Sequence, residues 1–285
     1  MPVRLCLLAL LAAVPAWGAL PVPGAGAASG LKFLGCLSGK LPPVKQPRTP
    51  RPGGCRLTQH AQLDADGSGL NHLFGLTASP DGRSLYTVSN DGAIGIFSRN
   101  PGTGKLIYRS CLTGGKGANT ASEIGACKTI PTATRAYQGI DSGLGAIASL
   151  AVSPDGRFVY VAAGGDTAVA TRVRADDGSL TFRGCISGEY GRGTGTGDPF
   201  TPIPTAVDVG FDSGMWLIKQ LAISRDGRSL YGPSRGDDAV DSFSRDPATG
   251  ALACAGLSSL AFAAGKLYAT AGGQSAVGSF SVAGG

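Results

Sequence analysis

The chain has 285 residues, 46 of them glycine and 18 proline, and 42% of the residues are hydrophobic. Charged residues make up only 15%, against about 25% in an average domain, and the formal net charge is +6 at pH 7. Strong helix formers are scarce, with Glu123 and Glu189 as the only glutamates, so the composition excludes a helix-rich fold or a coiled coil. The basic residues are scattered singly, which argues against nucleic-acid binding.

Residues 1–27 have the pattern of a secretory signal peptide. Arg4 gives a short basic region, residues 5–14 are apolar, and residues 25–27 form a small-residue cleavage site, with a cut after Gly18 as the alternative. No later apolar run approaches the roughly 18 residues of a membrane span. The sequence therefore predicts a secreted or periplasmic protein without a membrane span, folded as a single domain over residues 31–285.

Removal of the signal peptide leaves an even number of cysteines in an oxidising compartment, which predicts disulfides among Cys36, Cys55, Cys111, Cys127, Cys185 and Cys254. Short spacing favours the local pairs Cys36–Cys55 and Cys111–Cys127, each worth about 3 kcal/mol in the chain-entropy model. Cys185 and Cys254 are then left to pair at long range or to remain thiols. A zinc site is not expected, because the sequence has no C-x-x-C motif and its only histidines are His60 and His72.

One pattern recurs three times along the chain. A Ser-Gly entry is followed by an apolar stretch, then by a Ser-[Pro/Arg]-Asp-Gly-Arg turn and a [Leu/Val]-Tyr strand. The serine of the turn always comes ten residues after the entry glycine, in the pairs Gly69 and Ser79, Gly143 and Ser153, and Gly214 and Ser224. Proline and glycine give this turn the dihedral angles of a tight reversal. Such regular repetition predicts a repeat fold.

Each copy contains four short predicted strands. The second strand lies at 83–88, 157–162 and 228–231, the third begins at Asp91, Asp166 and Asp238, and the fourth, which ends in a cysteine, lies at 106–111 and 180–185. Four antiparallel strands per repeat predict an all-β protein, a β-propeller with blades at about 71–112, 145–186, 217–254 and 257–283 plus 31–37. The N-terminal strand would complete the last blade and close the ring, which removes exposed sheet edges.

The blade count has two interpretations. Long loops are expected at 114–141 and 188–211, but almost no chain separates Leu252 from Leu260. Either the four blades form a compact ring, or blades of a larger ring are missing at 252–260 through a deletion or a faulty gene model.

These motifs resemble a known family. The phrase S-P-D-G-R-x-[LV]-Y, followed by D-x-A-[IV] and T-G-x-L, is similar to the YVTN-type and lactonase-like β-propellers, which include phosphogluconolactonase-like and carboxymuconate-cyclase-like proteins. The G-C-[LI]-S strand resembles their secreted, disulfide-bearing relatives. The resemblance covers about residues 71–283 and implies the fold. Members usually have seven blades, and their lactonases use histidine, arginine and acidic side chains in the central channel; none of those motifs matches this chain residue by residue.

Candidate ligand-binding residues lie in the entry loops, because such loops line one mouth of a propeller's channel. They are Asp66, His72, Asp141, Asp212 and Trp216. A ring of aspartates would suit calcium or would position a water, whereas the favoured alternative is that Asp-Ser-Gly only shapes a turn. His72 is a candidate general base, and Trp216 is expected to pack at the channel mouth.

Two glycine-rich stretches of the sequence are expected to be loops without a ligand. Residues 64–69 resemble a calcium loop but have Gly75 where the bidentate glutamate belongs, and residues 191–197 lack the features of a phosphate-binding loop. No metal or other cofactor is therefore expected, with calcium as the alternative.

The main functional hypothesis is a secreted binding module that takes a small molecule or a protein at the channel rim. The alternative is a hydrolase or cyclase that acts on a small lactone, with or without a metal ion. A third interpretation is a decayed relative without function.

Overall fold

The structure is a computed structural model, which describes residues 34–40, 55–62, 68–89, 92–115, 127–134, 140–190, 200–254, 260–263, 266–271 and 276–281. The chain divides into two compact units, Met1–Leu34 and Gly35–Gly285, and every strand named below belongs to the second. The predicted signal peptide, residues 1–27, lies outside the described residues.

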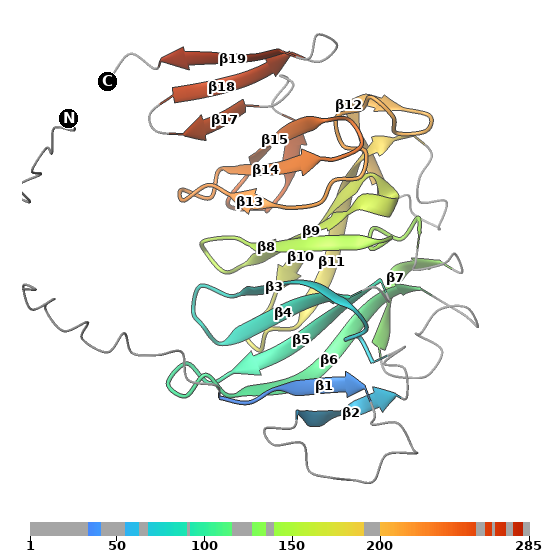
Figure 1. Cartoon of the computed structure of the whole chain (residues 1–285), viewed down its shortest axis with the longest axis vertical. Coiled ribbons are helices and arrows are strands. Elements are labelled where there is room, and N and C mark those ends of the chain that lie inside the picture. Colours follow the sequence, from blue (N-terminus) through green and yellow to red (C-terminus); the bar gives the residue numbers. More distant parts are fainter. Residues whose placement is uncertain are drawn as a thin grey trace, which may run out of the picture. The chain divides into compact units, whose positions relative to one another are not determined.

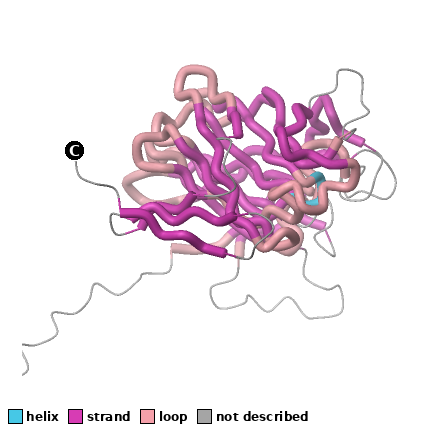
Figure 2. Tube along the Cα trace, turned by 90° about the horizontal axis from the view of Figure 1, so that it is seen from above, coloured by secondary structure: helices cyan, strands magenta, loops and turns pink. Residues whose placement is uncertain are grey.

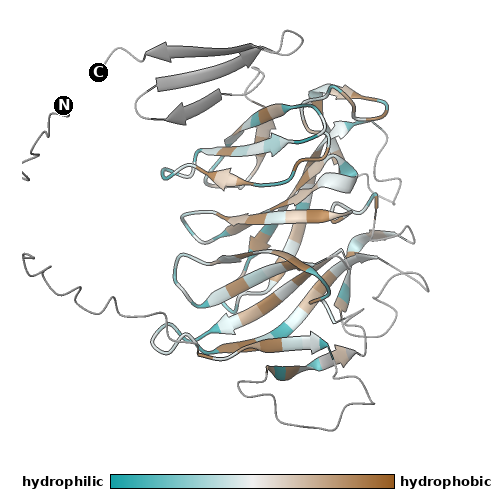
Figure 3. Cartoon of the chain, in the orientation of Figure 1, coloured by the Kyte–Doolittle hydropathy of each residue, from teal (hydrophilic) through white to brown (hydrophobic). Residues whose placement is uncertain are grey.

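Strands make up nearly all of the regular structure, which confirms the all-β class (Figure 1). Within the described ranges one 3-10 turn, Gly164–Asp166, is the sole helical element (Figure 2). Hydrophobic residues concentrate in the strands of the sheets (Figure 3). In the part of the chain that the structure describes, no helix has the length and apolarity needed to cross a membrane.

The two large sheets share one plan. Each has four successive antiparallel strands and a fifth strand that pairs parallel to the fourth. The strands of the first sheet are β3 Leu73–Ala78, β4 Ser84–Ser89, β5 Ala93–Arg99, β6 Leu106–Gly115 and β7 Cys127–Thr134. Those of the second are β8 Ile147–Val152, β9 Phe158–Ala163, β10 Ala168–Arg174, β11 Leu180–Glu189 and β12 Phe200–Val207.

Three smaller sheets repeat parts of this plan. The third antiparallel meander consists of β13 Ala222–Ile223, β14 Ser229–Ser234, β15 Ala239–Arg245 and β16 Leu252–Cys254. A three-stranded sheet follows, with β17 Leu260–Ala263, β18 Lys266–Ala271 and β19 Ala276–Ser281. Near the N-terminus, β1 Leu37–Lys40 pairs parallel to β2 Arg56–Gln62, as β6 pairs with β7.

The expectation of long loops at 114–141 and 188–211 is wrong in part, because β7 and β12 lie within them. Both strands contain Ile-Pro-Thr-Ala and show no alternation of apolar and polar residues. They nevertheless contribute to the core, since Ile130 and Ala133 of β7 are buried, as are Ile203 and Ala206 of β12. Pairing to a cysteine-bearing strand, rather than local periodicity, makes these segments strands.

Disulfides join the parallel pairs in the N-terminal part of the chain. Cys36 is bonded to Cys55 next to the β1–β2 pair, and Cys111 to Cys127 across β6 and β7, which are the two local pairings expected from the spacing. In the second sheet the same register sets Phe200 opposite Cys185. Cys254 does not occupy the repeat's cysteine position: it pairs with Phe243 as Tyr108 pairs with Phe97, so it stands where β6 has an aromatic residue.

The hydrophobic core lies between successive sheets. One cluster joins Tyr86 and Ile94 of the first sheet to Leu150 and Val161 of the second. A second cluster joins the opposite face of the second sheet, through Tyr160, to the third meander. The first strand of the first sheet differs from its counterpart β8, because its apolar side chains remain exposed, with Leu73, Phe74 and Leu76 at 50%, 61% and 70%.

An arginine clamp holds neighbouring sheets together. Arg245 ends β15 and is only 4% exposed, and its guanidinium bonds Asp155 in the turn of the preceding sheet at 2.9 Å. It also donates to the Tyr160 hydroxyl at 2.6 Å and to the Gly227 carbonyl at 2.7 Å. The Tyr160 hydroxyl in turn donates to the Gly250 carbonyl at 2.9 Å.

The same clamp joins the second sheet to the first, in a more exposed setting. Arg174 bonds Asp81 at 2.8 Å and the Tyr86 hydroxyl at 3.0 Å. The Ser79 hydroxyl, against the effect of burial and with the help of Arg174, lowers the pKa of Asp81 to about 2. The turn motif of the sequence repeat therefore supplies the carboxylate in both arginine clamps.

Loss of the more buried clamp should cost more stability than loss of the exposed one. Arg245→Met leaves Asp155 and the Tyr160 hydroxyl without their cation, and we expect a loss of about 3 kcal/mol in the free energy of unfolding. Arg174→Met is the matched control and should cost clearly less, because the Asp81 side chain is 42% exposed against 32% for Asp155. Urea unfolding of both variants measures the difference, and equal losses would contradict this account.

Candidate functional site

A pocket of about 250 Å³ lies between β1 and the first entry loop. Its lining comprises all of β1 and the four residues 70–73 that lead into β3. Lys40 and His72 are exposed there, whereas Asn71 is 8% exposed. Two exposed residues that carry an ammonium group and an imidazole therefore line a single hollow, so the pocket can offer hydrogen-bond donors to a polar ligand.

The same close contact sets each entry loop against the strand before it. Gly39 of β1, Gly114 of β6 and Gly188 of β11 touch the entry-loop serines Ser68, Ser142 and Ser213, so closely that a Cβ at any of the three glycines would clash. The first loop is thus held against β1 as the second is held against β6. This contact fixes the wall of the pocket.

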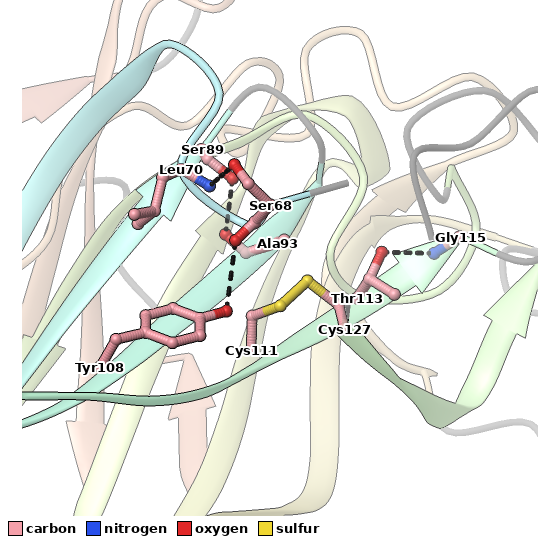
Figure 4. The surroundings of a disulfide bond; sticks show 9 residues. All are labelled: Ser68, Leu70, Ser89, Ala93, Tyr108, Cys111, Thr113, Gly115 and Cys127. Carbon is pink, nitrogen blue, oxygen red and sulfur yellow. Dashed lines mark hydrogen bonds between the residues drawn. A yellow bond between two sulfur atoms is a disulfide. The ribbon is translucent and has the colours of Figure 1, made fainter. Parts of the chain in front are cut away.

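The Cys111–Cys127 disulfide contacts the first entry loop, which contains Ser68 and Gly69 (Figure 4). Gly69 lies directly on it, since a Cβ there would come within 2.7 Å of the Cys111 Cβ and 3.1 Å of the Cys127 sulfur. The Tyr108 hydroxyl donates to the Ser68 carbonyl at 3.2 Å, which anchors the same loop to β6. The position of the pocket wall therefore depends on the staple between β6 and β7.

His72 occupies a strained backbone position that recurs in every entry loop. Its φ is 44°, and the corresponding Ala146 and Leu217 have φ of 43° and 55°. A positive φ at these residues turns the chain from the loop into the first strand of the sheet. The first loop alone of these three carries an imidazole at this point.

Asp141 and Asp212 stand in loops whose backbone binds another carboxylate. Asp166 accepts the N–H groups of Asp141, Gly143 and Gly145 at 2.7, 2.7 and 2.8 Å. Burial raises the pKa of Asp166 to about 6, against the opposite effect of these N–H bonds. The carboxylate closes the second entry loop onto the turn between β9 and β10.

Asp237 does the same in the third entry loop. It accepts the N–H groups of Asp212, Gly214 and Trp216 at 2.9, 2.8 and 3.0 Å. The residue that matches Asp166 is therefore Asp237 and not Asp238, where the sequence repeat set the start of the third strand. The signal was present in the sequence, because the same 23 residues separate the glycine from the carboxylate in both repeats.

Trp216 is engaged in packing. Its ring lies edge-to-face against Phe211, with centroids 4.1 Å apart, and it covers Gly236 so closely that a Cβ there would clash. Asp66 and residues 191–197 lie outside the described residues, as does most of the calcium-loop-like segment 64–69. Within the described ranges, no three His, Cys, Asp or Glu side chains gather to hold a metal ion.

A second carboxyl with an altered pKa lies beside the third entry loop. Burial raises the pKa of Asp241 to about 7, with a further contribution from nearby Asp237, although the Ser234 hydroxyl donates to it at 2.6 Å. Gly95 and Ala170 occupy this position in the first two sheets. The third sheet therefore has a carboxyl group where the others have a small residue.

Comparisons with known proteins found solved structures with limited similarity but no family. No protein-family model matches the chain, and no curated protein matches it. A putative 6-phosphogluconolactonase of Bacteroides fragilis is 19% identical at a TM-score of 0.41, with 67% of this chain and 38% of that chain covered. One from Bacteroides uniformis is 18% identical at a TM-score of 0.43, with 70% and 47% covered.

The periplasmic gluconolactonase of Pseudomonas aeruginosa is 21% identical at a TM-score of 0.40, with 62% of this chain and 37% of that chain covered. The present chain spans less than half the length of each of these three solved structures.

Asp166→Asn should destabilise the protein. The two Asp166 oxygens together accept three N–H groups, and the substitution replaces one of these oxygens by an NH2 group, which cannot accept them. We expect a loss of about 3 kcal/mol in the free energy of unfolding. Asp177→Asn is the control, since Asp177 lies in an exposed turn and should cost little. Denaturant unfolding measures both, and a loss no larger than that of the control would show that the entry loop does not depend on this carboxylate.

Asp241 should make stability fall as the pH rises. Its pKa is raised in the folded state, so the folded protein holds this proton more tightly than the unfolded chain. The stabilisation is complete below about pH 4 and is lost as the pH rises through about 7, by on the order of 3 kcal/mol. In Asp241→Asn the fall between pH 5 and pH 8 should become clearly smaller, and the part that remains is due to Asp166, whose pKa is raised to about 6. An unchanged pH dependence would refute the assignment.

Proposed function

We propose that the protein binds a small, negatively charged molecule in the pocket beside His72. The observation that carries this proposal is that two exposed residues, Lys40 and His72, line one hollow of about 250 Å³. An exposed ammonium and an imidazole suit a carboxylate or a phosphate. Asp141, Asp212 and Trp216 have structural contacts of their own, which favours the His72 end of the predicted rim as the binding site.

The architecture that we infer for this site is a β-propeller over residues 31–285, with sheets as blades. Support comes from the repeated meanders, the repeated arginine clamp and the glycine–serine contact between each outer strand and the next entry loop. Since β1 touches the first entry loop as β6 touches the second, β1 has the position of an outer strand in the blade before β3. Ring closure through β17–β19 would then cover the exposed apolar side chains of β3.

Secretion is part of the proposal. The pattern of residues 1–27 is that of a signal peptide, and two disulfides are typical of an oxidising compartment. The pocket would then meet extracellular or periplasmic ligands.

Hydrolysis of a small lactone is the second candidate function, favoured by the presence of His72 and Lys40 in the lining of one pocket. His72 would take a proton from a water that attacks the lactone carbonyl, and Lys40 would stabilise the oxyanion. The ring C–O bond then breaks, and the ring oxygen takes up the proton to give a hydroxy acid. A metal-assisted form would instead depend on added calcium.

Ligand binding and turnover separate the two functions. We expect gluconate or 6-phosphogluconate to bind wild-type protein saturably in calorimetry, and Lys40→Ala or His72→Asn to weaken binding about tenfold or more. Asparagine is chosen because it tolerates positive φ. Lys128→Ala, an exposed lysine of β7, is the control and should leave binding unchanged.

The same variants are assayed on gluconolactone and 6-phosphogluconolactone, with calcium and with chelator. Turnover that is lost in His72→Asn supports the hydrolase, and turnover lost with chelator supports the metal-assisted form. Binding without turnover supports the binding module. Wild-type protein with neither saturable binding nor turnover would refute both functions at this pocket.

A further inference from the structure

Arg172 is the most unusual buried group in the described part of the chain. Its side chain is fully buried, and among the described residues no hydrogen-bond acceptor reaches any of its three guanidinium nitrogens. The strand register gives it the position that Phe97 has in the first sheet and Phe243 in the third. An arginine thus replaces an aromatic core residue, and a buried cation without compensation would be very costly.

Two neighbours on the same face of the sheet offer compensation. The guanidinium carbon lies 5.3 Å from the centre of the Phe182 ring, directly opposite in β11. Cys185 is opposite Ala170, so its side chain is diagonal to Arg172 on the face that contributes to the first core cluster. Burial lowers the pKa of Arg172 to about 10, and the influence of Cys185 acts in the opposite direction.

The other charged groups around this face already have partners. Asp166 accepts three backbone N–H groups, and Arg174, two residues along β10, is paired with Asp81. The Tyr86 hydroxyl, from the first sheet, donates to the Gly178 carbonyl. Cys185 is therefore the acidic group best placed to supply a negative charge to Arg172.

A comparison of the repeats shows why Cys185 differs from the other cysteines of its kind. In the first sheet, the parallel strand sets Cys127 opposite Cys111 and the two form a disulfide. In the second sheet, the parallel strand sets Phe200 opposite Cys185. The repeat that has no cysteine in the fifth strand is also the one that has an arginine in its core.

We propose that Cys185 is a thiolate stabilised by the charge of the nearby Arg172 guanidinium, without a direct hydrogen bond between them, and that it is a site of covalent modification by small disulfides and electrophiles. In the reaction with a small disulfide compound, the Cys185 sulfur attacks one of the two sulfur atoms of that compound. A new S–S bond forms, the old one breaks, and the departing thiolate takes a proton from water. The thiolate form is required, because it is the nucleophile in this exchange.

The edge of the second sheet provides the route to the thiolate. Cys185 is 5% exposed and lies beside its register partner Phe200, which is also 5% exposed and belongs to the edge strand β12. Residues 183–186 also line a cavity of about 150 Å³ together with Thr201 and Leu252. Modification should therefore be limited by local opening of β12, and Phe200→Ala should accelerate it.

Cys254 gives an internal comparison within the same protein. It is partly buried in β16, and burial raises its pKa to about 11, with a smaller contribution from Asp241. Two thiols of one folded chain should thus have very different pKa values. That of Cys185 should lie below the ordinary cysteine value of about 8.5, and that of Cys254 above it.

The test follows the alkylation of both cysteines by iodoacetamide in intact wild-type protein between pH 5 and pH 10, with each site quantified by peptide mass spectrometry. We expect the relative rate at Cys185 to reach half its maximum below pH 7, and the rate at Cys254 still to rise at pH 10. Thiolate absorbance at 240 nm in Cys254→Ser should show the same low midpoint, and Cys254→Ser, Cys185→Ser should lose it.

Substitution of the arginine identifies the cause. Arg172→Met should move the Cys185 midpoint upward by at least two pH units, whereas Arg172→Lys should keep it below 8. If Arg172→Met does not fold, the wild-type profiles and Arg172→Lys still decide the question. A Cys185 midpoint at or above 8.5 in wild-type protein, or one that does not respond to loss of the cation, would overturn the proposal.

Discussion

One carboxylate in each of the two Ser-Pro-Asp-Gly-Arg turns serves two sheets at once. Asp155 accepts the N–H of Arg157 at 3.0 Å and a hydrogen bond from the Ser153 hydroxyl, so it shapes its own turn, and it also binds Arg245 of the next sheet at 2.9 Å. A residue that closes a local reversal thereby determines where the following sheet docks. Repetition of this arrangement, through Asp81 and Arg174, makes the spacing between sheets a property of the turn.

The second and third entry loops depend on another repeated interaction of the same kind. A carboxylate from the turn between the second and third strands gathers three backbone N–H groups of the loop, which leaves little freedom to the residues around it. Because these backbone contacts fix the shape of a loop, its other residues can differ from one loop of the chain to the next. Histidine, alanine and leucine occupy the same strained position in the three loops, and this variation gives the first loop its chemical character.

Much of the fold could be predicted from the sequence, because turn residues and apolar alternation are local properties. The strands around Tyr86 and Tyr160 follow directly from the Ser-Pro-Asp-Gly-Arg turns. The strand at 127–134 could not be predicted in this way, because it is a strand only through its pairing with β6, which is not adjacent to it in the sequence. Likewise, the sequence alone showed an aspartate in each entry loop, but not that the loop's N–H groups bind a different aspartate, Asp166 or Asp237.

Both disulfides stand on the side of the chain that forms the pocket. Cys36–Cys55 joins the segments that carry β1 and β2, and Cys111–Cys127 lies under Gly69, whereas the corresponding place in the second sheet is filled by Phe200. Cross-linking is thus unevenly distributed, and resistance to local opening is unevenly distributed with it. In a reducing environment the segments around the pocket would lose their cross-links while the centre of the molecule kept its packing, so local opening would begin at that end of the chain.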